Sequence, residues 1–486
     1  MKVGTTERKR RDRRRATSAG LRAVGRAIAL TALVAAGLGL SAAPVSAQSR
    51  AVLERVLRRE VLPNGLEVIV VENHAVPLVT LEIDVRNGSF TQTPETEGLA
   101  HLYEHMFFKA NAAWPDADDF LGRASELGAR FNATTQEERV NYFLTVPRDS
   151  MAGALQFLAA ALRAPLFRVD ELGREREVVL GEYDRNESSP FFALQQAMGR
   201  LLYGREFARK NTIGNRDIIA RATPEQMRAI QQRYYVPNNC ALIVAGDVVP
   251  DSVFALARRT LGDWPRQADP FVAAPVPPLP PFTRDTAVIV EAPVSAITVL
   301  LQWNGPSVRR DPAATYAADV FSDALNQPGS ALQRRLVDSG LWQGFGVNYY
   351  TLDQTGPITL SGQTTVENFR AAMRALDDEL AKFDDPGYIR AVELEHVKAS
   401  RRVTSAFGLE RASDLAHTIG FWWAVASLDY FLGYVDNMAK QSLADLQRYA
   451  RTYIVDRPRL VGVLLSPEDR AKLGLREADL LAGRAR

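Results

Sequence analysis

The chain has 486 residues, 46% hydrophobic and 24% charged, an ordinary globular composition that is long enough for two or three domains. A chain of this length can bury a large core without disulfides or a structural metal, so any metal that it binds is expected to serve chemistry. Residues 1–26 carry ten basic and two acidic residues, a charge of +8. The whole chain has a net charge of +2, so the remaining residues carry −6. The body of the protein therefore repels phosphates, and no nucleic-acid partner is expected.

The N-terminus has the three parts of a secretory signal peptide. The basic stretch is followed by an apolar run over residues 27–40 and then by Val45-Ser46-Ala47. This pattern predicts a signal peptide over residues 1–47, with cleavage before Gln48. A membrane anchor is the alternative, but the run is shorter than the about 20 apolar residues that a bilayer requires. We expect an exported, periplasmic protein without a stable membrane span after cleavage, and the export route stays open.

After this segment the chain divides into two similar halves. A proline-rich linker over residues 266–284 separates a first domain, residues 48–265, from a second domain, residues 285–486. Each half begins with two strand-like segments and continues with long helical stretches; the strands are expected at 66–71, 79–85, 287–290 and 297–301, and the helices include 151–162 and 368–382. The repetition predicts an α+β fold of two homologous domains, each a mostly antiparallel sheet covered by helices, in a clam-shell arrangement.

The single cysteine, Cys240, excludes internal disulfides, and one cysteine cannot build a zinc site of the cysteine type. We interpret it as a small buried apolar residue. The aromatic segment over residues 421–423, with Tyr430 and Phe431 after it, is interpreted in the same way as core or as a domain interface.

The segment over residues 97–109 carries the chemistry. Its apolar residues recur with helical spacing, and His101 and His105 lie one turn apart, so their rings project side by side and can clamp a metal. Neutral imidazole suits Zn²⁺. Glu104 lies close to both on the same helix and can take a proton from water beside the metal. The alternative is a solvated helix face, but the chain has only five histidines, so this spacing rarely arises by chance.

A catalytic zinc usually has three protein ligands, and the third is expected to be a carboxylate. An acidic helix over residues 170–182 offers Glu175 and Glu182, which are two turns apart on one face. Either residue can bind the metal while the other orients a ligand.

The segment from Gly98 to Lys109 resembles the active-site helix of the pitrilysin/insulinase family of inverzincin metallopeptidases, and the chain is most similar to the shorter processing-peptidase branch. The resemblance implies one Zn²⁺ per chain, held by His101, His105 and Glu182. It also implies that Glu104 is the general base and that Glu175 is the supporting acid.

The stretch over residues 131–135 resembles the family's strand beside the metal. The resemblance implies substrate contacts at Asn132, Ala133 and Thr134, with Tyr142 after them. The edge of such a strand accepts a peptide backbone by β-augmentation.

The second half departs from the family pattern. Self-sufficient members carry an Arg and, seven residues later, a Tyr that hold substrate; here Leu336 and Gln343 stand at those positions, and Arg335 is one position away. By resemblance, the chain is expected to be the metal-bearing subunit of a heterodimer whose homologous partner supplies the Arg/Tyr pair.

Together these features predict an exported zinc-dependent endopeptidase that hydrolyses peptides or small unfolded polypeptides. Two alternatives stay open. One is a non-catalytic peptide-binding or scaffold subunit of a peptidase complex. The other is a specialised peptidase that matures one particular peptide. The sequence does not separate it from a general endopeptidase, because specificity depends on cavity shape.

Overall fold

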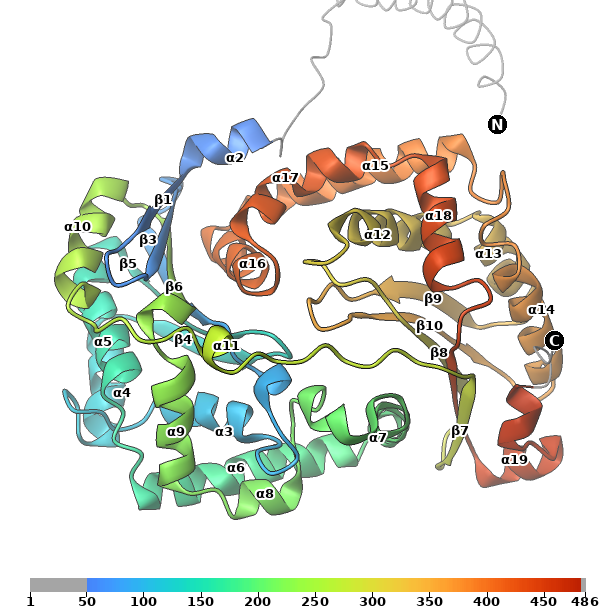
Figure 1. Cartoon of the computed structure of the whole chain (residues 1–486), viewed down its shortest axis with the longest axis horizontal. Coiled ribbons are helices and arrows are strands. Elements are labelled where there is room, and N and C mark those ends of the chain that lie inside the picture. The colour runs from blue at the N-terminus through green and yellow to red at the C-terminus, as the bar shows by residue number, and fades with distance from the viewer. Residues whose placement is uncertain (1–49, 482–486) are drawn as a thin grey trace, which may run out of the picture. The chain divides into compact units, whose positions relative to one another are not determined.

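The protein is described by a computed structural model over residues 50–481, in which two α+β halves are each built on one sheet (Figure 1). The predicted signal peptide, residues 1–47, lies outside the described residues. Within residues 50–481, none of the helices combines the length and the apolar character needed to cross a membrane.

The sheet of the first half has six strands in the order β1-β2-β6-β3-β5-β4. All neighbours are antiparallel except β2 and β6, which run parallel. Strand β4 lies at one edge. The strands are β1 (Leu57–Val61), β2 (Glu67–Glu72), β3 (Leu78–Val85), β4 (Arg130–Thr135), β5 (Val140–Pro147) and β6 (Cys240–Gly246).

The sheet of the second half repeats this arrangement. Its order is β7-β11-β8-β10-β9, with β7 and β11 parallel and the other neighbours antiparallel. The strands are β7 (Thr286–Glu291), β8 (Ile297–Asn304), β9 (Gly344–Tyr349), β10 (Pro357–Thr364) and β11 (Leu460–Leu465). The order matches β2-β6-β3-β5-β4, so the first sheet differs only by its extra edge strand β1. The predicted α+β fold with two homologous sheets is confirmed.

The helices also follow one another in a similar order in the two halves. Those of the first half are α2 (Arg50–Val56), α3 (Leu99–Phe107), α4 (Ala117–Glu126), α5 (Met151–Arg163), α6 (Val169–Glu187), α7 (Pro190–Tyr203), α8 (Arg216–Ala220), α9 (Pro224–Tyr234), α10 (Pro250–Leu261) and α11 (Pro270–Ala273). Those of the second half are α12 (Pro312–Asn326), α13 (Ala331–Gln333), α14 (Phe369–Leu380), α15 (Ala391–Phe407), α16 (Ala412–Val425), α17 (Leu428–Ala439), α18 (Leu443–Tyr453) and α19 (Pro467–Leu473). Helices α5 and α14 lie where the sequence predicts helices, and α11 occupies part of the predicted linker.

One helix from each half packs against the sheet of the other half. Helix α16 packs on β3 and β6 of the first sheet, where Ile419 and Trp423 join Ile243 in one apolar cluster. Helix α7 packs on β7 and β11 of the second sheet, where Leu194 joins Leu464. Helices α7 and α16 each follow the longest helix of their half, so the exchange is reciprocal. The predicted burial of the aromatic segment over residues 421–423 is confirmed at Trp423, which is 2% exposed.

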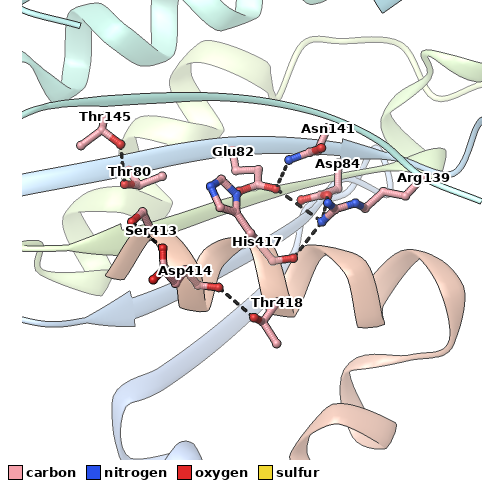
Figure 2. A network of polar contacts seen from close by, with 10 residues as sticks. All are labelled: Thr80, Glu82, Asp84, Arg139, Asn141, Thr145, Ser413, Asp414, His417 and Thr418. Atoms are coloured by element: carbon pink, nitrogen blue, oxygen red, sulfur yellow. Dashed lines mark hydrogen bonds and ion pairs between the residues drawn. The ribbon is translucent and has the colours of Figure 1, made fainter. Parts of the chain in front are cut away.

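A buried polar cluster lies between α16 and the first sheet (Figure 2). Arg139, just before β5, donates to the backbone carbonyl of His417 at 2.8 Å and lies 3.5 Å from Asp84 and 3.7 Å from Glu82. Asn141 donates to Glu82 Oε1 at 2.6 Å, and His417 Nδ1 pairs with Glu82 Oε2. These five residues are called the junction cluster below. Its two carboxylates are completely buried, so the contact between the halves includes charges as well as apolar packing.

Candidate metal centre

Helix α3 is held in place by its apolar face. Gly98 precedes the helix with a φ of 97°, and a Cβ at this position would lie 2.8 Å from Gly214 Cα, so the approach of these two segments requires glycine. Leu102 and Met106 are almost completely buried in the first core. The opposite side of the helix therefore presents a partly exposed polar group, which consists of His101, Glu104 and His105.

Tyr142 fixes this helix from the neighbouring sheet. Its ring stacks on that of Phe107 with centroids 3.6 Å apart, and its hydroxyl lies 2.6 Å from the hydroxyl of Tyr235. Tyr142 is 0% exposed. The predicted substrate contact of Tyr142 is therefore wrong, because a side chain with no exposed surface packs the core beneath α3 and cannot touch a bound peptide.

The structure brings His101, His105 and Glu182 together. Glu182 Oε2, from α6, lies 3.5 Å from His101 Nε2 and 3.9 Å from His105 Nε2, and one ligand atom of each residue falls within 4.8 Å of the others. Tetrahedral zinc with bonds of about 2.0–2.1 Å separates its ligands by about 3.3–3.4 Å, so the three residues fit this ion with small adjustments. In the described part of the chain no lysine or arginine pairs with Glu182. The carboxylate therefore has only the two rings as partners.

Glu175 supports one of these rings. Its Oε2 lies 3.1 Å from His105 Nδ1, and its Oε1 lies 2.6 Å from Lys109 Nζ. Burial opposes ionisation of Glu175, but the hydrogen bonds from His105 and Lys109 outweigh it and lower the pKa of this carboxyl. An ionised acceptor at Nδ1 directs Nε2 of His105 toward Glu182. Sequence reasoning missed Lys109, although it lies one helical turn past His105.

The two rings differ in their electrostatics. Burial, and then the charge of His105, lowers the pKa of His101 to about 4, so this ring is neutral near pH 7. Burial also disfavours a charged His105, but the hydrogen bond to Glu175 and the charges of Glu104 and Glu182 outweigh it and raise the pKa of His105. The negative groups around His105 are those that a bound cation would neutralise.

Glu104 comes directly before His105 on α3 and has a hydrogen-bond partner on the sheet. The hydroxyl of Thr135, the last residue of β4, donates to Glu104 Oε2 at 2.6 Å. Burial raises the pKa of Glu104, and this hydrogen bond and the charge of His105 lower it in part. Sequence reasoning included Thr135 in the strand beside the metal but gave it no role.

Strand β4 offers the edge that the sequence predicts beside the metal. Among the described residues it pairs only with β5, so its other side is free to accept a further strand. Asn132 and Thr134 are exposed, and Ala133 is 9% exposed. Strand β4 itself contacts α3.

The positions expected for the Arg/Tyr pair have no such function here. Leu336 is 0% exposed and belongs to the core of the second half. Gln343 is exposed, and its backbone N–H donates to the carbonyl of Gln363 at 2.8 Å. Arg335 is also exposed, so no cation or phenol stands at either aligned position.

Two family models match consecutive parts of the chain. The model described as "Insulinase (Peptidase family M16)" matches residues 67–213, which include the candidate metal centre, and that described as "Peptidase M16 inactive domain" matches residues 221–401. Curated relatives include Coenzyme PQQ synthesis protein F of Pseudomonas aeruginosa (30% identity over 47% of this chain and 30% of that protein) and Zinc protease PqqE of Helicobacter pylori (26% identity over 81% and 89%). The chain thus spans less than a third of the first relative and most of the second.

Solved structures share the fold. A protease from Helicobacter pylori superposes with a TM-score of 0.74 at 23% identity, covering 84% of this chain and 99% of that one. The periplasmic protease PqqL from Escherichia coli gives a TM-score of 0.73 at 21% identity, covering 88% of this chain and 49% of that one. At these identities the likeness concerns the fold alone.

Proposed function

We propose, from the premise that the chain belongs to the insulinase family (peptidase family M16), that it is a zinc-dependent endopeptidase acting on peptides or small unfolded polypeptides. The observation that carries the proposal is the convergence of His101, His105 and Glu182 beside a fourth polar residue, Glu104. Three nitrogen and oxygen ligands that leave a coordination position open are typical of catalytic zinc.

In this mechanism His101, His105 and Glu182 hold the ion, and Glu175 orients His105. When bound, zinc supplies Lewis-acid chemistry, which acidifies water and polarises the carbonyl of the scissile bond. Glu104 takes the proton from the attacking water and passes it to the nitrogen of the leaving amine. The exposed edge of β4, with Asn132, Ala133 and Thr134, binds the substrate backbone as an added strand.

Binding at a strand edge selects for extended chains. A folded protein has its backbone groups already paired, whereas a peptide or an unfolded polypeptide offers free N–H and C=O groups. The substrates proposed here are therefore unfolded in the segment that is cut.

We propose that the protein is exported to the periplasm after cleavage before Gln48. The basic and apolar segments of residues 1–47 support this proposal, as does the periplasmic relative from Escherichia coli. The test is N-terminal sequencing of the protein recovered from a periplasmic fraction, which should begin at Gln48. A chain that begins at Met1 and stays in the cytoplasm would contradict it.

We also propose that the active form is a heterodimer with a homologous subunit. Leu336 has neither the charge nor the N–H donors of an arginine, and Gln343 has no phenol hydroxyl, so the aligned positions of this chain do not supply the Arg/Tyr pair. The same observation favours the second candidate, a non-catalytic peptide-binding subunit. Peptide hydrolysis by the isolated chain at the rate of its complex would rule out the need for a partner.

The deciding experiment compares the mature chain with its Glu104→Gln variant on a mixed peptide library, each zinc-loaded and each with and without candidate partners. The variant is expected to keep one zinc per chain and to lose turnover by at least about 100-fold, because general-base catalysis contributes about 10²–10⁴-fold. Normal turnover in Glu104→Gln would show that Glu104 is not the base. Peptide binding without hydrolysis in every assembly would favour the non-catalytic subunit.

A further inference from the structure

In the described part of the chain, the residue that donates to the carboxylate of the general base is Thr135, which is not on the helix of Glu104. The Thr135 hydroxyl donates to Glu104 Oε2 at 2.6 Å, and the backbone N–H of Thr135 also interacts with this carboxylate. Donation to Oε2 leaves Oε1 for water. A carboxylate without such a contact rotates about its terminal bond, which has a broad, roughly two-fold torsional preference.

Thr135 is itself firmly held. It pairs with Val140 at the end of the β4–β5 ladder, so its backbone is fixed by the sheet. Side chains alternate along a strand, so Phe131, Ala133 and Thr135 share one face of β4. Phe131 packs on Phe108, with ring centroids 4.9 Å apart, which turns this face toward the end of α3. The hydroxyl of Thr135 therefore points to Glu104 from a rigid support.

The strand that carries Thr135 is also the strand whose outer edge is free. The N–H and C=O groups that can pair with a substrate belong to the same few residues that hold the base. A peptide paired with β4 thus takes its position from the backbone that also sets the position of the carboxylate. This arrangement fixes the distance between the scissile carbonyl and the base within one structural element.

We propose that Thr135 is a positioning residue, which holds the Glu104 carboxylate with one oxygen toward water and aligns it with a substrate bound along β4. The inference rests on the proposed peptidase function. Its physical content is that the hydroxyl contributes to the rate of the chemical step, through Glu104, and contributes nothing to zinc binding or to peptide affinity. Valine keeps the shape and the backbone of this residue and removes only the hydroxyl, whereas serine keeps the hydroxyl.

The experiment compares Thr135→Val, Thr135→Ser and a matched control, Thr145→Val, in the assembly that hydrolyses peptides. Thr145 is on the neighbouring strand β5 and pairs its hydroxyl with that of Thr80 on β3 at 2.8 Å (Figure 2). Removing a hydrogen bond to a charged group should lower kcat in Thr135→Val by about 10- to 100-fold. KM and zinc affinity, measured by competition with a chelator, should stay within about twofold of the wild type, and Thr135→Ser should recover most of kcat.

Three results measured in solution would overturn the inference. They are a wild-type kcat in Thr135→Val, an equal loss in Thr135→Ser, and a loss in Thr135→Val that follows zinc affinity or thermal stability. Crystal structures of zinc-loaded Thr135→Val and Thr135→Ser add a readout that needs no activity. The Glu104 carboxylate should keep its orientation in Thr135→Ser and lose it in Thr135→Val. An unchanged orientation in Thr135→Val would also overturn the inference. Failure of the proposed function gives a different result. In that case the wild type and Glu104→Gln are equally inactive, whereas failure of the inference about Thr135 leaves the wild type active.

Discussion

Two groups of histidine and carboxylate side chains in the described residues, the candidate metal centre and the junction cluster, differ in what satisfies them. At the candidate metal centre, Glu182 is 33% exposed and meets only the rings of His101 and His105. In the junction cluster, Glu82 is completely buried and has Arg139, Asn141 and His417 around it. In the described residues no lysine or arginine pairs with Glu182, whereas Arg139 lies beside both carboxylates of the junction cluster.

The comparison shows what makes a meeting of His and Glu a metal site. A carboxylate that is already paired with a guanidinium and an amide has its lone pairs occupied and its charge balanced, so it does not need a cation. A carboxylate that faces the Nε2 atoms of two histidines has neither a guanidinium nor an amide as its partner. Convergence of ligand atoms without a resident cation is therefore the feature that separates a metal centre from a structural contact.

Removal of one histidine from each cluster gives the largest expected difference. His101→Ala should abolish both zinc binding and turnover, because two ligands do not hold catalytic zinc well. His417→Ala should leave the zinc content at one per chain and lower the free energy of unfolding by about 1–3 kcal/mol, since it removes a hydrogen bond to a buried charge. Metal analysis and urea unfolding of both variants measure these effects. Zinc loss in His417→Ala would show that the two clusters are not independent.

Arg139→Met should give the largest loss of stability in the junction cluster. The variant leaves Glu82 and Asp84 buried without their cation, and breaking a buried ion pair in this way costs about 3–5 kcal/mol. Arg148→Met is the matched control, because Arg148 pairs with Asp247 at the surface, where such pairs contribute at most about 1 kcal/mol. Urea unfolding midpoints report both. Equal losses in the two variants would mean that Arg139 does not balance the buried acids.

Gly420→Ala tests how closely α16 approaches the sheet. A Cβ on Gly420 would overlap the carboxylate of Asp84, so α16 must shift away from β3, at a cost of about 1–3 kcal/mol. Glycine-to-alanine changes inside helices normally stabilise by about 0.5–1 kcal/mol. Gly122→Ala, in α4, has open space around it and should follow that rule. Thermal unfolding should therefore shift in opposite directions in the two variants.

The sequence predicts the metal centre better than it predicts the contact between the halves, because the two depend on different distances along the chain. His101, Glu104 and His105 are neighbours on one helix, so their spacing alone brings them together. The choice between Glu175 and Glu182 was open from spacing and was made only by the family resemblance. In the structure, Glu182 faces both Nε2 atoms and Glu175 faces Nδ1.

Other parts of the structure have no local pattern that reveals them. The junction cluster joins positions near residues 82, 139 and 417, which no periodicity relates. The strands predicted at 66–71, 79–85, 287–290 and 297–301 correspond to β2, β3, β7 and β8. The exchange of α7 and α16 was not predicted, since helical periodicity shows that a face is buried without showing which sheet buries it. Tyr142 was assigned to substrate by the family resemblance, and no local pattern corrected this. Its sheet is covered on both faces, so alternation along β5 does not distinguish an exposed side chain from a buried one.

The smallest expected effect is a pH dependence that arises in the junction cluster. Burial, and then the charge of Glu82, raises the pKa of Asp84 well above its usual value, and Arg139 opposes this in part. His417, from α16, and Cys240, on β6, also lie near this pair. An acid whose pKa is higher in the folded state contributes stability that is fully present below the unfolded pKa of about 3.9 and is lost as pH rises through the folded pKa.

Asp84→Asn should therefore remove part of the decline in stability above about pH 4. The free energy of unfolding of the variant, relative to the wild type, should rise with pH. The total rise should be about 1.4 kcal/mol for each unit of pKa shift that is removed. Asp247 provides a control of opposite sign. Its hydrogen bond with His74, and then the one from Arg148, lower the pKa of Asp247, so Asp247→Asn should lose stability near neutral pH, and this loss should vanish in acid. Urea unfolding between about pH 2 and about pH 9 measures both differences. A difference between Asp84→Asn and the wild type that does not vary with pH would mean that the buried carboxyl is ionised at every pH, and that Arg139 alone balances both acids of the junction cluster.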